Sequence, residues 1–238
     1  MNALILCAGL GTRLRPLTDH VPKPLIPIVD QVLLSRIIDG VMEANPEKIF
    51  LNSHHLFEKM EQYAANDRRV TKLFHEPVIL GTAGPLARLR DAGESDELLV
   101  VNGDLWQTID IGRFVEEARA SGAEVVLLGR SNPEIDTLYL EKGHLVGIKD
   151  RFGTTEGEHR LTFTGISWYS SSALARIPSE LFDIRDFWKS ECEAERSPAV
   201  IDAGEVKWID IGTPVGLQEA IEAREEELRN AEEGGADG

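Results

Sequence analysis

The chain has 238 residues, of which 42% are hydrophobic and 28% charged, as expected for a soluble globular protein with a core of ordinary size. Its 25 basic and 41 acidic residues give a formal net charge of −16, which argues against nucleic acid and anionic membranes as partners. No apolar run is long enough to span a bilayer, no basic signal-peptide lead is present, and the two cysteines lie outside any zinc-binding spacing. We therefore expect a cytoplasmic protein without a disulfide or a structural zinc site.

The first half of the chain alternates short apolar runs with helical patterns. The apolar runs, which are typical of buried parallel strands, cover residues 3–7, 48–52, 98–101 and 124–128. Apolar residues at helical spacing predict helices over residues 32–44, 56–65 and 111–120. This order predicts an α/β fold with a Rossmann-like, doubly wound, mixed but mainly parallel sheet.

The second half has a different rhythm. Strands are predicted over residues 137–140, 144–148 and 161–169, joined by short polar turns that favour antiparallel additions to the sheet. Helices are predicted over residues 182–195 and 214–229. Residues 225–238 contain six acidic residues and one arginine and end in Gly-Gly-Ala-Asp-Gly, so we expect a partly disordered acidic tail.

A glycine-rich turn follows the first predicted strand and contains Gly9, Gly11, Thr12 and Arg13. Such a turn lets backbone N–H groups approach phosphates. Three interpretations compete: a dinucleotide site, a nucleotide cradle in which Arg13 contacts departing phosphates, and a plain strand-to-helix turn. The first is disfavoured because Leu14 stands where the dinucleotide pattern requires a third glycine.

Two aspartates follow apolar runs at points where strands are expected to end. Asp104 comes after residues 98–101, and Asp210 after residues 206–209. Ligands of open α/β sheets bind at the carboxyl ends of the strands, and two carboxylates with phosphate oxygens and waters make a typical Mg²⁺ site. The alternative for each aspartate is a helix N-cap. Lys23, held between two prolines, suits a phosphate, but taken by itself a solvated surface lysine is the better interpretation.

Several motifs together resemble one known family. The stretches Ala8–Thr18 and Pro22–Leu25 are similar to the signature of the nucleotidylyltransferases that activate sugar 1-phosphates. Further similar stretches follow in family order: Gly81–Gly84, Val101–Asp104, Phe163–Ile166 and Trp208–Pro214. The resemblance implies a Rossmann-like nucleotide-binding core. It also implies Mg²⁺-dependent transfer of a nucleoside monophosphate from an NTP to a sugar 1-phosphate, with release of pyrophosphate.

The resemblance also implies roles for individual residues. The catalytic set is Arg13 on the leaving pyrophosphate, Lys23 on the α-phosphate, and Asp104 and Asp210 as metal ligands. The nucleotide would be contacted by Leu6, Ala8, Gly9, Gly11, Thr12, Arg13, Lys23, Glu76, Gly81, Thr82, Asn102 and Asp104. For Glu76, an exposed loop carboxylate is an equal alternative to a contact with the base.

The acceptor sugar would be contacted by Trp106, Asp150, Arg151 and Gly165. Packing in the core is an equal alternative for Trp106. Asp150 and Arg151 stand where many relatives carry Glu-Lys-Pro, so the sugar contacts depart from the family pattern. We expect a single domain over residues 1–224, with its nucleotide-binding part at about 1–110 and its sugar-binding part at about 111–224.

Within the family, the motifs look most like N-acetylmuramate-1-phosphate uridylyltransferases, followed by mannose-1-phosphate guanylyltransferases. Glucose-1-phosphate thymidylyltransferases and cytidylyltransferases that use phosphocholine remain alternatives, and the base and sugar stay open. We expect no second catalytic domain after residue 224 and a monomer or homodimer. A non-catalytic regulatory homologue that binds a nucleotide sugar is the competing class.

Overall fold

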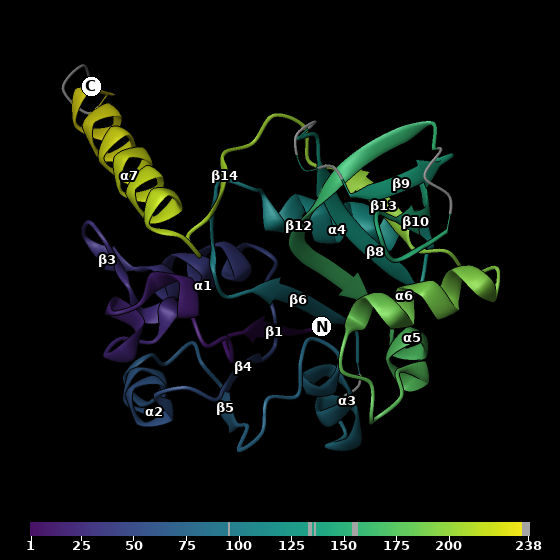
Figure 1. Cartoon of the computed structure of the whole chain (residues 1–238), viewed down its shortest axis with the longest axis horizontal. Helices are drawn as coiled ribbons and strands as arrows, with labels where there is room; N and C mark the ends of the chain where they lie inside the picture. The colour runs from purple at the N-terminus through teal and green to yellow at the C-terminus, as the bar shows by residue number, and fades with distance from the viewer. Residues whose placement is uncertain (95, 133–134, 136, 154–156, 235–238) are drawn as a thin grey trace.

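The protein is described by a computed structural model that covers residues 1–94, 96–132, 135, 137–153 and 157–234 (Figure 1). Ten strands of these residues form one mixed sheet, in the order β11-β10-β13-β8-β12-β6-β1-β4-β5, with β9 pairing β10 and β12. Helices lie on both faces of the sheet. The predicted α/β class is therefore confirmed.

The N-terminal half of the sheet is parallel, as the apolar runs predict. Strand β1 pairs with β4 on one side and β6 on the other, and β4 pairs with β5, all in parallel. These strands are β1 (Asn2–Leu6), β4 (Ile49–Ser53), β5 (Lys72–His75) and β6 (Leu98–Asn102). Their parallel direction brings the carboxyl ends of β1 and β6 to the same edge.

The second half of the sheet is largely antiparallel, as predicted for the additions, but these are so extensive that the sheet as a whole is not mainly parallel. Strand β12 runs antiparallel between β6 and β8, while β13 returns parallel to β8. The turn at Lys142 and Gly143, both with positive φ, joins β9 to β10, and a two-residue turn fixes antiparallel pairing. The strands are β8 (Val125–Arg130), β9 (Leu138–Glu141), β10 (His144–Ile148), β11 (Phe152–Gly153), β12 (His159–Tyr169) and β13 (Ala199–Asp202).

Alternation along β1 separates two hydrophobic clusters, one on each face. Ala3 and Ile5 join the cluster with helices α1 (Leu33–Glu43) and α4 (Ile111–Ser121), whereas Leu4 joins the cluster on the opposite face. That opposite cluster includes residues of α3 (Gly84–Asp91), α5 (Ser171–Arg176) and α6 (Ile184–Glu193). Helix α2 (Phe57–Asn66) contributes Met60 to the first cluster.

Short elements beside the main sheet position the site. Strand β7 (Leu105–Gln107) pairs antiparallel with β14 (Trp208–Asp210), and β2 (Pro27–Ile28) pairs with β3 (Gln31–Val32). Three single turns of 3₁₀ helix follow β1: η1 (Thr12–Leu14), η2 (Leu17–Asp19) and η3 (Lys23–Leu25). The β7–β14 pair brings the segment after Asp104 beside the segment that ends at Asp210.

Helix α7 (Pro214–Gly234) runs past the predicted helix end at residue 229, through most of the segment expected to form an acidic tail. Residues 225–234 continue the helix, and Glu227 accepts two hydrogen bonds from the Arg36 guanidinium. The sequence suggested disorder because the segment is acidic and has few apolar residues, but ion pairs attach it to the domain. In Figure 1, α7 leads away from β14 to the C-terminus. Residues 235–238 lie outside the described part. No helix in the described ranges is long and apolar enough to cross a bilayer.

Candidate active site

A cleft of about 260 Å³ opens where β1 and β6 end. Eight of its lining residues are among those predicted to contact a nucleotide: Leu6, Ala8, Gly9, Lys23, Gly81, Thr82, Asn102 and Asp104. Five further residues line it without having been predicted: Cys7, Pro24, Asn52, Ile79 and Gly103. The structure therefore brings together residues that lie about a hundred positions apart in the sequence.

The glycine-rich turn forms one wall of this cleft. Gly11 has a φ of 63°, a left-handed conformation that favours glycine. Its carbonyl accepts a hydrogen bond of 2.8 Å from the Thr18 hydroxyl, and a Cβ at Gly11 would lie 2.8 Å from the Thr18 methyl group. Gly11 and Thr12 are thus placed to shape the turn, while Gly9 lines the cleft itself.

Arg13, Lys23, Asp104 and Asp210 meet in space, and we call them the charged quartet. The Lys23 ammonium lies 2.9 Å from Asp104 Oδ2 and 3.4 Å from Asp210 Oδ1. Arg13 Nη2 lies 3.3 Å from Asp210 Oδ2. Lys23 is buried, but both carboxylates are about 40% exposed. Two cations and two anions therefore balance each other at a site that a ligand can reach.

Asp210 ends β14 and is held by the backbone that follows it. The Gly212 N–H donates a 2.7 Å hydrogen bond to Asp210 Oδ1. Burial alone would raise the pKa of Asp210, but the Gly212 hydrogen bond and the charges of Lys23 and Arg13 outweigh it. The pKa of this carboxyl therefore lies below its ordinary value, and Asp210 is ionised at neutral pH.

Glu76 is buried, so the alternative of an exposed loop carboxylate is wrong; it is not among the residues that line the cleft, and its contact with the base stays a prediction. Its carboxylate accepts hydrogen bonds from Asn52 Nδ2 at 2.8 Å and from the Leu80 N–H at 3.0 Å. Asn52 in turn accepts a 2.7 Å bond from the Cys7 N–H. Glu76 thus fixes the loop before Gly81 and orients a cleft residue, because a buried carboxylate needs such donors.

Gly103 and Cys7 pack tightly against each other beside Asp104. A Cβ at Gly103 would lie 2.8 Å from Cys7 Sγ and 2.7 Å from the Leu6 carbonyl oxygen. Burial, with a smaller contribution from the Asp104 charge, strongly raises the pKa of the Cys7 thiol. Burial therefore favours the protonated thiol, as is typical of a packing cysteine.

A second hollow of about 330 Å³ adjoins the cleft and shares Leu6, Gly81, Thr82 and Asn102 with it. The other lining residues are largely apolar or aromatic: Leu86, Val100, Phe163, Ser167, Tyr169, Phe182, Asp183, Ile184, Arg185 and Trp188. Predicted sugar residue Gly165 lies beside it, because a Cβ there would be 2.9 Å from Asn102 Nδ2.

The loop before α6 is tied to the Gly81–Gly84 turn. The N–H groups of Thr82 and Ala83 both donate to the Phe182 carbonyl, at 2.8 and 3.1 Å. The Ile184 N–H donates back to the Thr82 hydroxyl at 3.0 Å. The two hollows therefore share a wall whose parts belong to distant segments.

None of the four predicted sugar residues lines either hollow. Trp106 is fully buried in the core, with the Arg36 guanidinium 4.4 Å from its ring, so the packing alternative is correct. Arg151 pairs with Asp183, which lines the second hollow, at 2.6 Å and with Asp186 at 3.1 Å. Asp150 is exposed at the β10–β11 turn. Only Gly165 lies beside the hollows.

Some overlooked residues carried a usable sequence signal. Asn52 ends the apolar run of β4 as Asn102 ends that of β6, and equivalent ends of neighbouring parallel strands meet at one edge. Gly212 follows Asp210 in the Gly-Thr-Pro motif. No comparable pattern marks the loop of Phe182 and Asp183, because only tertiary packing brings it to Gly81.

The donor set of Asp104 and Asp210 fits a hard divalent cation that keeps several other ligands. Within the described residues, no group of three or more His, Cys, Asp or Glu side chains could hold a metal ion by itself. Mg²⁺ is commonly bound by one or two carboxylates together with substrate phosphates and waters. Because both carboxylates are exposed, there is room for phosphate oxygens and waters as the other ligands of such a metal. The site can therefore hold a metal together with a polyphosphate.

Comparisons with known proteins agree with this arrangement. Residues 2–136 match the family model described as nucleotidyl transferase. The chain is 25% identical over 250 residues to UTP–glucose-1-phosphate uridylyltransferase of Synechocystis, covering 93% of this chain and 62% of that protein. It is 37% identical over 134 residues to the bifunctional protein GlmU of Methanocaldococcus jannaschii, covering 56% of this chain and 31% of GlmU.

A third relative is the catalytic subunit beta of mannose-1-phosphate guanylyltransferase of Danio rerio, with 37% identity over 135 residues, 53% of this chain and 38% of that protein. The chain thus spans less than two thirds of the length of these relatives.

Among solved structures, a putative glucose-1-phosphate thymidylyltransferase from Bacillus anthracis matches with a TM-score of 0.78 and 22% identity, covering 94% of both chains. HddC from Yersinia pseudotuberculosis matches with a TM-score of 0.74 and 21% identity, over 93% of this chain and 98% of that one. The fold, the charged quartet at the strand ends and the family match over more than half of its residues together show that the chain belongs to the nucleotidyl transferase family.

Proposed function

We propose that this chain transfers a nucleoside monophosphate from an NTP to a sugar 1-phosphate and releases pyrophosphate, in a reaction that requires Mg²⁺. The observation that carries the proposal is the charged quartet, in which a buried lysine lies within 3.4 Å of two accessible carboxylates. Relatives named for uridylyl and guanylyl transfer to sugar 1-phosphates support the same class of reaction.

In the proposed reaction, a phosphate oxygen of the sugar 1-phosphate attacks the α-phosphorus of the NTP. A new P–O bond forms to the sugar phosphate, the bond to the bridging α–β oxygen breaks, and pyrophosphate carries away the negative charge. Such transfers depend on positioning and charge stabilisation rather than on a covalent enzyme intermediate. Lys23 would hold the α-phosphate and the incoming phosphate, and Arg13 would neutralise the leaving group.

Mg²⁺ held by Asp104 and Asp210 would supply positive charge to the phosphate oxygens. This charge is needed because the quartet itself is neutral overall, with two cations and two anions, whereas an NTP and a sugar phosphate are both anionic. The low pKa of Asp210 keeps one of the ligands ionised throughout the neutral range.

We place the nucleotide in the cleft and the acceptor in the adjoining second hollow. The cleft carries the glycine-rich turn, Gly81 and Asn102, which supply backbone and amide groups to a base, ribose and phosphates. The second hollow joins it at Asn102 beside Gly165, and its aromatic side chains include Phe163 and Trp188. Apolar and aromatic rings pack well against the faces of sugars and their acyl groups.

Among sugar phosphates we propose N-acetylmuramate 1-phosphate with UTP first and mannose 1-phosphate with GTP second. A cytoplasmic location and a monomeric or homodimeric state are part of the same proposal. The test is a matrix of the four NTPs against sugar 1-phosphates and phosphocholine, with pyrophosphate release and product mass as readouts. Turnover with phosphocholine and CTP alone would assign the phospho-alcohol class instead, and no turnover across the matrix would favour the regulatory homologue.

Matched variants separate catalysis from folding. Asp104→Asn should lower pyrophosphate release at least about 100-fold, as expected when a group that stabilises transition-state charge is lost. The control is Asp202→Asn, at the end of β13, whose exposed carboxylate accepts one bond from the Gly204 N–H. Equal turnover of both variants at all metal concentrations would refute the assignment of Asp104.

A further inference from the structure

Arg36 of helix α1 lies between the two segments that carry the aspartates of the charged quartet. Its Nη2 donates to the Gln107 carbonyl at 3.1 Å and to Glu227 Oε1 at 2.9 Å, and its Nη1 donates to Glu227 Oε2 at 3.0 Å. The guanidinium carbon lies over the Trp106 ring, 4.4 Å from its centroid. One side chain therefore contacts both β7, which follows Asp104, and α7, which follows Asp210.

The register of the small ladder explains why these contacts matter to the site. Asp210 pairs with Leu105, and Ile209 pairs with Trp106. The Ile211 N–H donates to the Asp104 carbonyl at 3.3 Å. A shift of β7 relative to β14 or α7 would therefore change the separation of the Asp104 and Asp210 carboxylates.

A second arginine extends the connection to Lys23. Arg224 of α7 donates two hydrogen bonds of 2.8 Å to Asp30 and one of 3.1 Å to Glu227. Asp30 lies in the turn of the β2–β3 hairpin, which follows η3 with Lys23. We call Arg36, Glu227, Arg224 and Asp30 the positioning network, because it joins the three segments that carry Lys23, Asp104 and Asp210.

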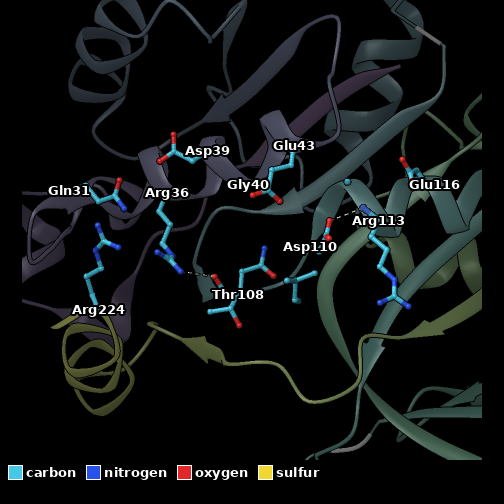
Figure 2. A pocket seen from close by; sticks show the side chains of 13 residues that line it. Gln31, Arg36, Asp39, Gly40, Glu43, Thr108, Asp110, Arg113, Glu116 and Arg224 are labelled. Carbon is cyan, nitrogen blue, oxygen red and sulfur yellow. Dashed lines mark hydrogen bonds between the residues drawn. The ribbon is translucent and has the colours of Figure 1, made fainter. Parts of the chain in front are cut away.

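The network is partly removed from solvent. The Arg36 side chain is 19% exposed and that of Glu227 is 27% exposed, and the fully buried Trp106 covers one face of the guanidinium. Bidentate arginine–carboxylate pairs combine charge with fixed geometry, unlike the mobile ion pairs of open surfaces. Figure 2 shows Arg36 and Arg224 entering the same hollow from α1 and α7, with Gln31 beside them.

Glu227 is not among the residues that line the cleft, so any effect on the site acts through its neighbours. We propose that Arg36 and Glu227 are positioning residues that hold Asp104 and Asp210 at the separation a divalent cation requires. This inference rests on the metal site of the proposed function and extends it to the C-terminal half of α7. Mutation of residues that orient metal ligands without touching the metal commonly changes metal affinity by about 10- to 100-fold.

The test compares Arg36→Lys and Glu227→Gln with the wild-type chain. Lysine keeps the charge but loses the bidentate contact and the flat stacking surface, and glutamine keeps the shape of Glu227 without its charge. The matched control is Glu225→Gln on the same helix, because Glu225 is exposed and contacts Arg229 only at 4.0 Å. Mn²⁺ binding is followed by electron paramagnetic resonance, and the Mg²⁺ concentration for half-maximal pyrophosphate release is measured in parallel.

We expect both variants to bind Mn²⁺ about tenfold more weakly and to need about tenfold more Mg²⁺, with turnover restored at saturating metal. The effects of the two changes should add less than fully in the double variant, because both remove the Arg36–Glu227 contact. Wild-type Mn²⁺ affinity in both variants would overturn the inference. This holds even if the thermal midpoints of the variants fall, because lower stability with unchanged metal affinity would mean that the Arg36–Glu227 pair only stabilises the fold.

The two readouts separate this inference from the proposed function. If the wild-type chain transfers no nucleotide but binds Mn²⁺ more tightly than the variants, the proposed activity fails and the positioning role stands. If turnover occurs with the same metal requirement in all chains, the activity stands and the positioning role is refuted. A wild-type chain that binds no Mn²⁺ would refute the positioning role directly.

Discussion

Replacing Gly212 by alanine adds one methyl group where three members of the charged quartet meet. An ideal Cβ at this position would lie 2.8 Å from Asp210 Oδ1 and 2.9 Å from Lys23 Nζ, and would overlap Arg13 Nη2. The Gly212 N–H bond to Asp210 is retained in the variant, because alanine keeps that donor. The perturbation is therefore steric and local.

The structure sets the size of the displacement. For Asp210 Oδ1 to move from 2.8 Å to an ordinary contact of 3.4 Å, it must shift by about 0.6 Å. A misplacement of about 1 Å can cost about 100-fold in rate, so we expect turnover to fall about 10- to 100-fold. The strain on the displaced side chains should cost only about 0.5–1.5 kcal/mol of folding stability, or a few degrees in thermal midpoint.

Pyrophosphate release at saturating substrates and metal measures the first effect, and thermal unfolding measures the second. The control is Gly40→Ala in α1, where the new Cβ would meet Ile111 at an ordinary 3.4 Å and should leave turnover unchanged. Turnover of Gly212→Ala within about twofold of wild type would refute the reasoning. A collapse of the fold would refute it as well, because the argument requires a local effect.

The remaining predictions concern the second hollow and the pH dependence of stability. Gly81→Ala should destabilise the protein by more than about 2 kcal/mol in urea unfolding, because a Cβ at a φ of 73° would overlap the Phe182 carbonyl; near-normal stability would contradict this. Glu191 is buried beside Arg176 and Arg196, and although burial raises its pKa, the two arginines outweigh burial and hold the pKa below its usual 4.5. Its charge therefore stabilises the fold fully above pH 4.5 and progressively less as the pH falls below that value. Glu191→Gln should cost about 1–3 kcal/mol at pH 7 and less at pH 3, and an equal loss at both pH values would exclude this ion-pair contribution.

The positions of the first-half strands and helices follow from local patterns that tertiary packing does not override. Short apolar runs became β1, β4, β6 and β8, and the helical stripes became α1, α2 and α4. The antiparallel additions were also predicted, but their extent was underestimated. Pairing direction depends on which strand lies next to which, and that choice is made by long-range contacts.

The sequence by itself determined the chemistry of the site through residue type and position at strand ends. Arg13, Lys23, Asp104 and Asp210 lie together as proposed, because parallel strands end at one edge and the β7–β14 ladder brings Asp210 to it. Only the tertiary structure decided the roles of Glu76 and Trp106, both of which are buried and hold other residues in place. It also placed the acidic segment after residue 225 against the domain, where Glu227 of α7 pairs with Arg36. Burial and ion pairing across nearly two hundred residues are properties of packing, and no local pattern records them.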